Sequence, residues 1–171
     1  MSEYFAYQYS GDAFDLFGVA HLGTVVGLAM LAALLLRAGR SASESDRGRL
    51  RIALAVFMLV HEAGWHVWNL YHGTWAVGHM LPLHLCSFMI WTSAVALVLG
   101  ARRYYPYVYF LGIAGATQAL ITPDAGMYGF PHYRFFETMI AHGGMVAMGL
   151  WVVVAEGLIP TWKMAARALL A

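Results

Sequence analysis

The chain has 171 residues, of which 61% are hydrophobic and only 11% are charged, and its formal net charge is +1. Ordinary soluble domains carry roughly a quarter charged residues, so this chain has too few to cover a globular surface in water. The composition therefore excludes an ordinary soluble protein and indicates a chain partly dissolved in lipid. The net charge points to no nucleic-acid partner, and the sequence contains no basic patch interleaved with aromatic residues.

Five segments are apolar enough to be predicted as membrane-spanning helices. The hydrocarbon layer is about 30 Å thick, and a helix needs about 20 mostly apolar residues to cross it. The predicted spans cover approximately residues 15–36, 51–72, 79–100, 104–122 and 135–158. The sequence therefore predicts an all-helical membrane bundle that forms a single domain over residues 1–171.

The segments between the predicted spans contain residues that interrupt helices or favour water. Segment 37–50 is rich in Arg and Ser and is predicted to be a solvated loop, and segment 123–134 contains two prolines and two glycines. A further helical segment starts at Pro160, but it is too short to cross the hydrocarbon before Ala171. It is therefore predicted to be a short C-terminal helix or the start of a sixth span.

The distribution of basic residues predicts the orientation of the chain. Lys and Arg concentrate on the cytoplasmic side of short loops. They lie in or beside loop 37–50, in turn 101–103 and in the C-terminal segment, whereas the other side of the predicted bundle has Arg134 alone. The sequence thus predicts a multi-pass protein of the cell membrane with its N-terminus outside and with these two loops and the C-terminus in the cytoplasm.

Polar side chains from all five predicted spans lie at one depth, within about 5–15 Å of the outer end at 1.5 Å per helical residue. Polar groups in hydrocarbon are costly, and they usually face a bundle interior or a wet cavity. The layer consists of His21, Glu62, His66, His84, Cys86, Gln118 and His142. A single buried His or Gln often serves only to join helices. Glu62 is harder to explain in that way, because a carboxylate at this depth needs a partner, and His66 shares its helical face.

Cys86 and His142 are the first candidates for chemistry in this layer. A thiol becomes a nucleophile when a base or a positive neighbour converts it to the thiolate. His142 is predicted to lie at the same depth as Cys86 on another helix. The alternative is that Cys86 is a small packing residue, which is the commoner role of a lone cysteine in a membrane helix.

The histidines of this layer could instead bind a metal ion or haem. His61, Glu62 and His66 resemble the H-E-x-x-H zinc motif, but these histidines are five residues apart, about 140° around a helix. We therefore reject that motif, although zinc held by histidines from separate helices stays open. Haem between two opposed histidines is also compatible with the sequence. On this basis we assign neither a metal site nor a cofactor.

Several motifs, taken together and in order, resemble a known family. They are Leu-Pro-Leu-His-Leu-Cys-Ser at 81–87, Leu-Gly-Ile-Ala-Gly-Ala at 111–116, Ala-Leu-Ile-Thr-Pro-Asp at 119–124, Phe-Pro-His-Tyr-Arg-Phe-Phe at 130–136 and Ala-His-Gly at 141–143. The chain resembles the YwaF-like integral membrane family over roughly residues 14–163. That family is related to transmembrane protein 164, a membrane acyltransferase of ether phospholipid remodelling. Its members continue past the segment at 160–163 into at least one more helix. The resemblance therefore implies a natural short form, a fragment that lacks a C-terminal helix, or a bundle that a protein partner completes.

The resemblance implies a Cys–His pair that acts on membrane phospholipids. Cys86 would attack a phospholipid acyl ester with His142 as general base, and a lysophospholipid would then accept the acyl chain. His21, Glu62 and Gln118 would orient His142 or stabilise the oxyanion. The alternative is a non-enzymatic lipid- or ligand-binding membrane module, or a membrane protein that holds a metal or haem through histidines.

Loop 123–134 is predicted to lie directly above the polar layer. Its side chains Asp124, His132 and Arg134 suggest a lid or a headgroup contact, and Arg134 is suited to a phosphate. The alternative is that the loop is an ordinary connection between helices.

Overall fold

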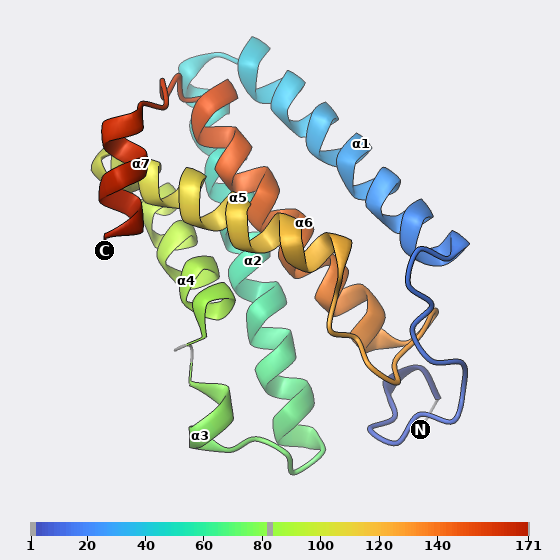
Figure 1. Ribbon diagram of the computed structural model, residues 1–171. Helices are drawn as coiled ribbons and strands as arrows, with labels where there is room; N and C mark the ends of the chain where they lie inside the picture. The colour runs from blue at the N-terminus through green and yellow to red at the C-terminus, as the bar shows by residue number, and fades with distance from the viewer. Residues whose placement is uncertain (1–2, 82–83, 171) are drawn as a thin grey trace.

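All regular structure is helical in residues 3–81 and 84–170, which are the residues that the computed structural model describes (Figure 1). This agrees with the predicted all-helical class. The helices are η1 (Glu3–Phe5), α1 (Val19–Ser41), α2 (Glu44–Tyr71), α3 (Val77–Met80), α4 (Leu85–Val98), η2 (Arg102–Tyr104), α5 (Tyr105–Ile121), α6 (Tyr133–Val154) and α7 (Trp162–Leu169).

Three of these helices, α1, α2 and α6, are long and apolar enough to cross a membrane. Helix α4 is also apolar, but its 14 residues extend for only about 21 Å. The predicted span 79–100 is divided, because α3 ends at Met80 and α4 begins at Leu85. Leu81 has an extended backbone conformation, as expected for a residue that precedes a proline. Residues 82–83 of this predicted span lie outside the described residues.

The predicted solvated loop 37–50 is wrong, because most of it is helical. Helix α1 continues to Ser41 and α2 begins at Glu44, so the connection is very short. Ser43 caps α2 by accepting a hydrogen bond from the backbone N–H of Asp46. Arg47 donates hydrogen bonds to the carbonyl oxygens of Gly39 and Ala42 at the end of α1. The polar residues here therefore stabilise two helix ends instead of forming a loop.

Helix α1 presents a long apolar face to its surroundings, and Figure 1 shows it running along one side of the bundle. The side chains of Val26, Met30 and Leu34 on this helix are 58–63% exposed. Exposed apolar surface on this scale is unfavourable in water. The exposure is therefore consistent with a helix that faces lipid.

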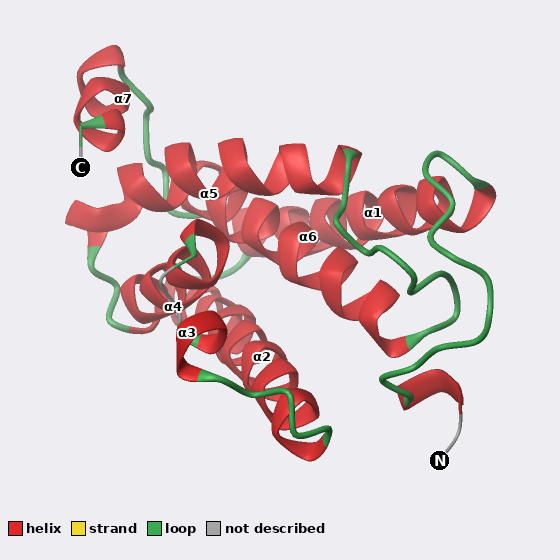
Figure 2. Ribbon diagram, turned by 60° about the horizontal axis from the view of Figure 1, so that its bottom comes forward, coloured by secondary structure: helices red, strands yellow, loops and turns green. Residues whose placement is uncertain are grey.

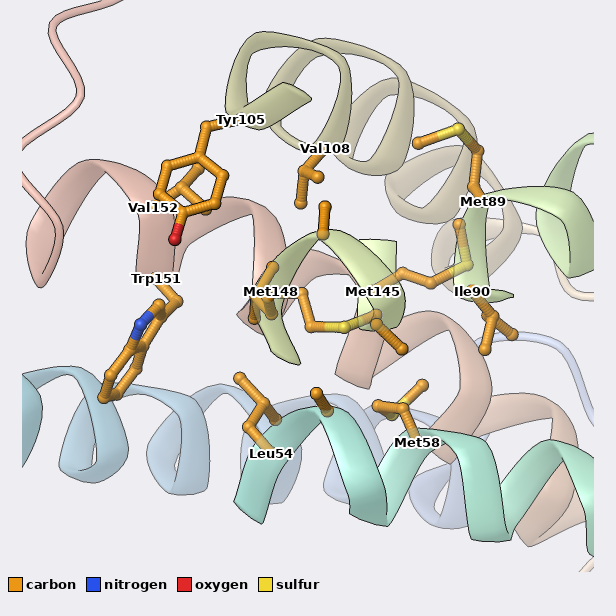
Figure 3. Packing of buried hydrophobic residues seen from close by; sticks show 14 of the residues in the cluster. Leu54, Met58, Met89, Ile90, Tyr105, Val108, Met145, Met148, Trp151 and Val152 are labelled. Carbon is orange, nitrogen blue, oxygen red and sulfur yellow. The ribbon is translucent and has the colours of Figure 1, made fainter. Parts of the chain in front are cut away.

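The hydrophobic core lies between α2, α4, α5 and α6 and is rich in methionine (Figure 3). Met58, Met89, Met145 and Met148 are all buried in it, and flexible thioether side chains fill irregular gaps between helices well. Trp151 of α6 points toward α1 (Figure 3), where Gly39 has no side chain and so leaves room for the indole ring.

Glu156, which follows α6, connects two arginines at one end of the bundle, which we call the basic end. Its carboxylate lies 3.6 Å from Arg51, seven residues into α2, and 3.8 Å from Arg102 of η2. Arg51 also donates a hydrogen bond to the hydroxyl of Tyr105. These contacts bring together the ends of three helices that are distant in sequence.

The N-terminal segment covers part of the opposite end and lies against the loop before α6 (Figure 2). The backbone N–H of Gly129 donates to the carbonyl of Asp12 at 3.0 Å, and the N–H of Phe14 donates to Gly126 at 3.2 Å. The hydroxyl of Tyr128 donates to the carbonyl of Tyr7. No role was predicted from sequence for this segment, which holds loop 123–134 in place.

Gly39→Ala should destabilise the bundle by about 1–3 kcal/mol. A Cβ at this position would clash with the ring of Trp151, which is fully buried and rigid. Gly23→Ala is the matched control on the same helix, because its Cβ would meet no atom within 4 Å. Thermal unfolding in detergent micelles would test this prediction, and equal melting temperatures for the two variants would contradict it.

Candidate functional site

A polar cavity of about 410 Å³ lies between α2, α4, α5 and α6, toward the end of the bundle that is opposite the basic end. Its walls carry carboxylate, guanidinium, imidazole, thiol, amide and hydroxyl groups. The lining residues are Glu62, Trp65, Cys86, Ser87, Ile90, Gly115, Gln118, Ala119, Thr122, Asp124, Arg134, Glu137, Thr138, Ala141 and His142.

Most of the predicted site residues line this cavity. They are Glu62, Cys86, Gln118, Asp124, Arg134 and His142. The cavity also has polar residues that were not predicted from sequence, namely Ser87, Thr122, Glu137 and Thr138. Glu137 could have been found from sequence, because it follows Arg134 by three residues and so shares its helical face.

Cys86 lies in the first turn of α4 and is partly buried. The first backbone N–H groups of a helix have no partner within the helix, and they carry the positive end of its dipole. The first hydrogen bond of this helix runs from the N–H of Phe88 to the carbonyl of His84. The thiol therefore lies in a position where a helix favours negative charge.

His142 lies on α6, and one of its ring nitrogens already forms a hydrogen bond within the helix. Its Nδ1 is 2.7 Å from the carbonyl oxygen of Thr138. A carbonyl oxygen can only accept a hydrogen bond, so the proton of the neutral ring is on Nδ1. The lone pair of Nε2 is left for another partner, as a general base requires.

Glu62 lies on α2, and its side chain is only 3% exposed. Among the described residues, its Oε1 atom has no hydrogen-bond partner. The closest cationic candidate is Nε2 of His66 at 3.9 Å, which is too long for a hydrogen bond. The other ring nitrogen of His66 accepts a hydrogen bond from Nε1 of Trp75, outside the cavity lining.

Arg134 is held by two neighbours on the cavity wall. Its guanidinium forms an ion pair with Glu137, and its Cζ atom lies 3.7 Å from the ring centroid of Trp65. The Glu137 side chain is 6% exposed and that of Arg134 is 17% exposed. The charge that was predicted to contact a headgroup phosphate is therefore already paired in this structure.

His21 is buried, does not line the cavity and joins the start of α1 to the end of α5. Its Nδ1 accepts a hydrogen bond from the N–H of Phe17, and its Nε2 donates to the carbonyl of Leu120 at 2.8 Å. Both ring nitrogens are thus used. His84, at the N-terminus of α4, is exposed and does not line the cavity either.

His132 lies just before α6 and is completely buried. Its Nδ1 accepts a hydrogen bond from the N–H of Arg134, which caps α6, and its Nε2 donates to the carbonyl of Ala6 at 2.9 Å. His132 therefore connects the N-terminal segment to α6. Within the described residues, no three His, Cys, Asp or Glu side chains gather as a metal site would require.

Comparison with known families supplies the classification. The model of the TMEM164 family matches residues 16–171. The chain belongs to the TMEM164 family. Searches of curated proteins and of solved structures found no match. Membership of this family and three helices long enough to span a bilayer identify the chain as a membrane protein.

Arg134→Ala should destabilise this TMEM164-family chain by about 3 kcal/mol, because it leaves the carboxylate of Glu137 buried without a partner. The double variant Arg134→Met/Glu137→Gln should recover most of that loss, since it removes both charges. Thermal unfolding of the two variants in one detergent would test this. A double variant no more stable than Arg134→Ala would show that the ion pair is not the cause.

The stability of this TMEM164-family chain should also fall as the pH drops below about 6.5. Burial lowers the pKa of His132, and the charges of Arg134 and His72 add to this effect, although the hydrogen bond to the carbonyl of Ala6 opposes it. The unfolded chain then binds a proton at a pH where folded His132 does not, so acid favours unfolding, by up to about 1.4 kcal/mol per pH unit.

His132→Asn keeps a side chain that can cap α6 but does not titrate. The drop in melting temperature between pH 7.5 and pH 5.5 should therefore be smaller in this variant than in the unmodified chain. Equal drops would assign the acid sensitivity to other groups.

Proposed function

We propose that this chain is a membrane-embedded phospholipid acyltransferase or lipase that uses Cys86 as nucleophile and His142 as general base. The observation that supports this most strongly is that both residues line one polar cavity, with the thiol at a helix N-terminus and His142 Nε2 free to accept a proton. The sequence resemblance to the YwaF-like proteins and to an acyltransferase relative agrees with this assignment.

In the proposed reaction, Nε2 of His142 takes the proton of the Cys86 thiol. The thiolate attacks the carbonyl carbon of a phospholipid acyl ester, and the tetrahedral intermediate collapses to an acyl-thioester. The lysophospholipid alkoxide leaves with the proton from His142. In the second half, His142 accepts the proton of a lysophospholipid hydroxyl or of water, and that oxygen attacks the thioester to release the product and the thiol.

The developing oxyanion needs hydrogen-bond donors close to the thiol. Backbone N–H groups in the first turn of α4, beside Cys86 and Ser87, are candidates, since they have no acceptor within the helix. The side chains of Gln118 and Thr138 line the same cavity and supply further donors. We assign Gln118 this role in place of His21, because both ring nitrogens of His21 are already bonded.

The proposal places the cavity in the outer half of the membrane, with the N-terminus outside. Arg51 and Arg102 meet at the other end of the bundle, which the positive-inside rule assigns to the cytoplasm. Ester groups of phospholipids lie just beneath the headgroups, so a thiol near the outer end of α4 is at a suitable depth.

A non-enzymatic lipid-binding module is the second candidate, and a separate observation favours it. An apolar cavity of about 560 Å³ lies between α1, α2 and α6, and residues such as Leu28, Phe57 and Ile140 line it. Acyl chains suit such a surface. This cavity lies on a different face of α6 from His142, and Cys86 does not line it, so lipid binding there would not require the proposed nucleophile.

Labelling of Cys86 by a lipid thioester probe in membranes should depend on His142. Cys86→Ser should abolish labelling, and His142→Ala should slow it about 100-fold or more, since general bases contribute at least that factor. His84→Ala is the matched control, because His84 is exposed and outside the cavity. Equal labelling rates in His142→Ala and His84→Ala, with the bundle folded, would leave the binding module as the better assignment.

A further inference from the structure

The polar cavity contains more negative than positive groups. The carboxylates of Glu62, Asp124 and Glu137 line it, whereas Arg134 is the one guanidinium among its described lining residues. Arg134 is already paired with Glu137 and stacked on Trp65. The guanidinium therefore does not compensate Glu62 directly.

Glu62 is the most informative of these groups. Its side chain is almost fully buried, and its Oε1 atom has no hydrogen-bond partner among the described residues. A buried carboxylate without a partner is costly, unless a proton or a cation compensates it. In the described part of the chain, His66 is the nearest cation candidate, and the 3.9 Å separation leaves Oε1 without a hydrogen bond.

The chemistry of the lining favours an organic ammonium group as that ligand. The described residues do not gather three metal-ligating side chains, so a chelated metal ion is disfavoured. An ammonium N–H group can donate directly to Oε1 of Glu62, and the carboxylates of the lining attract its positive charge. The cavity, at about 410 Å³, has the volume of a small-ligand site.

We propose that this cavity binds an ammonium group, with Glu62 as its counter-ion, and that a lipid headgroup supplies it. The inference deepens the proposed function by naming the headgroup class that enters the site. It stands on the cavity, the excess of carboxylates and the unpaired oxygen of Glu62, and not on the reactivity of Cys86.

Ligand-dependent thermal stability would test the proposal on the full chain in a non-ionic detergent. Short-chain phosphatidylethanolamine should raise the melting temperature in a concentration-dependent way, because ligands that bind the folded state stabilise it. Short-chain phosphatidylglycerol, which has the phosphate but lacks the amine, should give a much smaller rise. Free ethanolamine distinguishes a lipid headgroup from a soluble amine as the source of the ammonium group. A comparable rise with free ethanolamine would overturn the lipid as the source.

Glu62→Gln should weaken the apparent affinity for phosphatidylethanolamine at least about tenfold, because it removes a charge-assisted hydrogen bond. Without lipid, this variant should be no less stable than the unmodified chain, since it removes a buried unpaired charge. Glu44→Gln is the matched control, because it makes the same change at the exposed start of α2. Equal shifts with the two lipids, or a full shift in Glu62→Gln, would overturn the proposal.

The same measurement on Cys86→Ser separates this proposal from the acyltransferase proposal. This variant lacks the nucleophile and should keep the full shift with phosphatidylethanolamine. A retained shift together with labelling that does not depend on His142 would remove the acyltransferase assignment alone. Labelling that depends on His142 together with equal shifts for the two lipids would remove the ammonium site alone.

Discussion

Close packing around α6 is the constraint on which the rest of the structure depends. Helices α1, α2, α4 and α5 all contact it, and it is the most buried of the three candidate spans. Small residues make this possible, because a Cβ on Gly144 would meet Met58 and one on Gly149 would meet Ile113. Different faces of the same helix line the two cavities: Glu137 and His142 face the polar one, and Gly144 faces the apolar one. The geometry of the proposed site is therefore inseparable from the packing of the core.

Hydrogen bonds to the backbone divide three histidines, His21, His132 and His142, into two groups. Buried polar groups must find partners, and in lipid the partners must come from the protein. In His21 and His132 both ring nitrogens are bonded, so these side chains join helices and loops and have no free lone pair. His142 lines the cavity, where a carbonyl fixes one ring nitrogen as donor and leaves the other without a hydrogen bond among the described residues. The same interaction thus stabilises the fold in the first group and, under the proposed function, prepares a base in the other.

The helical membrane class and much of the cavity lining could be predicted from sequence. The small number of charged residues indicates the class, and the position of a residue along a predicted helix gives its depth. Prediction from sequence failed where tertiary contacts decide. Loop 37–50 was predicted from its polar residues, but Ser43 and Arg47 use their side chains to complete helix ends. His21 shares the depth of Glu62 without reaching the cavity, since depth does not specify which way a helix face points. The ion pair between Arg134 and Glu137 could have been found from sequence, because the two residues share one helical face. The N-terminal segment, by contrast, docks through backbone groups that leave no pattern in the sequence.

The two proposals are linked by charge. A thiolate at Cys86 would add a negative charge to a cavity that already contains Glu62, Asp124 and Glu137, and like charges in a poorly screened site oppose one another. The helix N-terminus at α4 offsets part of this cost, but a bound ammonium group would offset more of it, because it carries a full positive charge. Under these proposals the thiol would be activated mainly when a headgroup occupies the cavity, so the acidic lining would suppress thiolate chemistry in the absence of substrate. The excess of carboxylates, which at first argues against a thiol nucleophile, would then make its reactivity depend on the presence of the lipid.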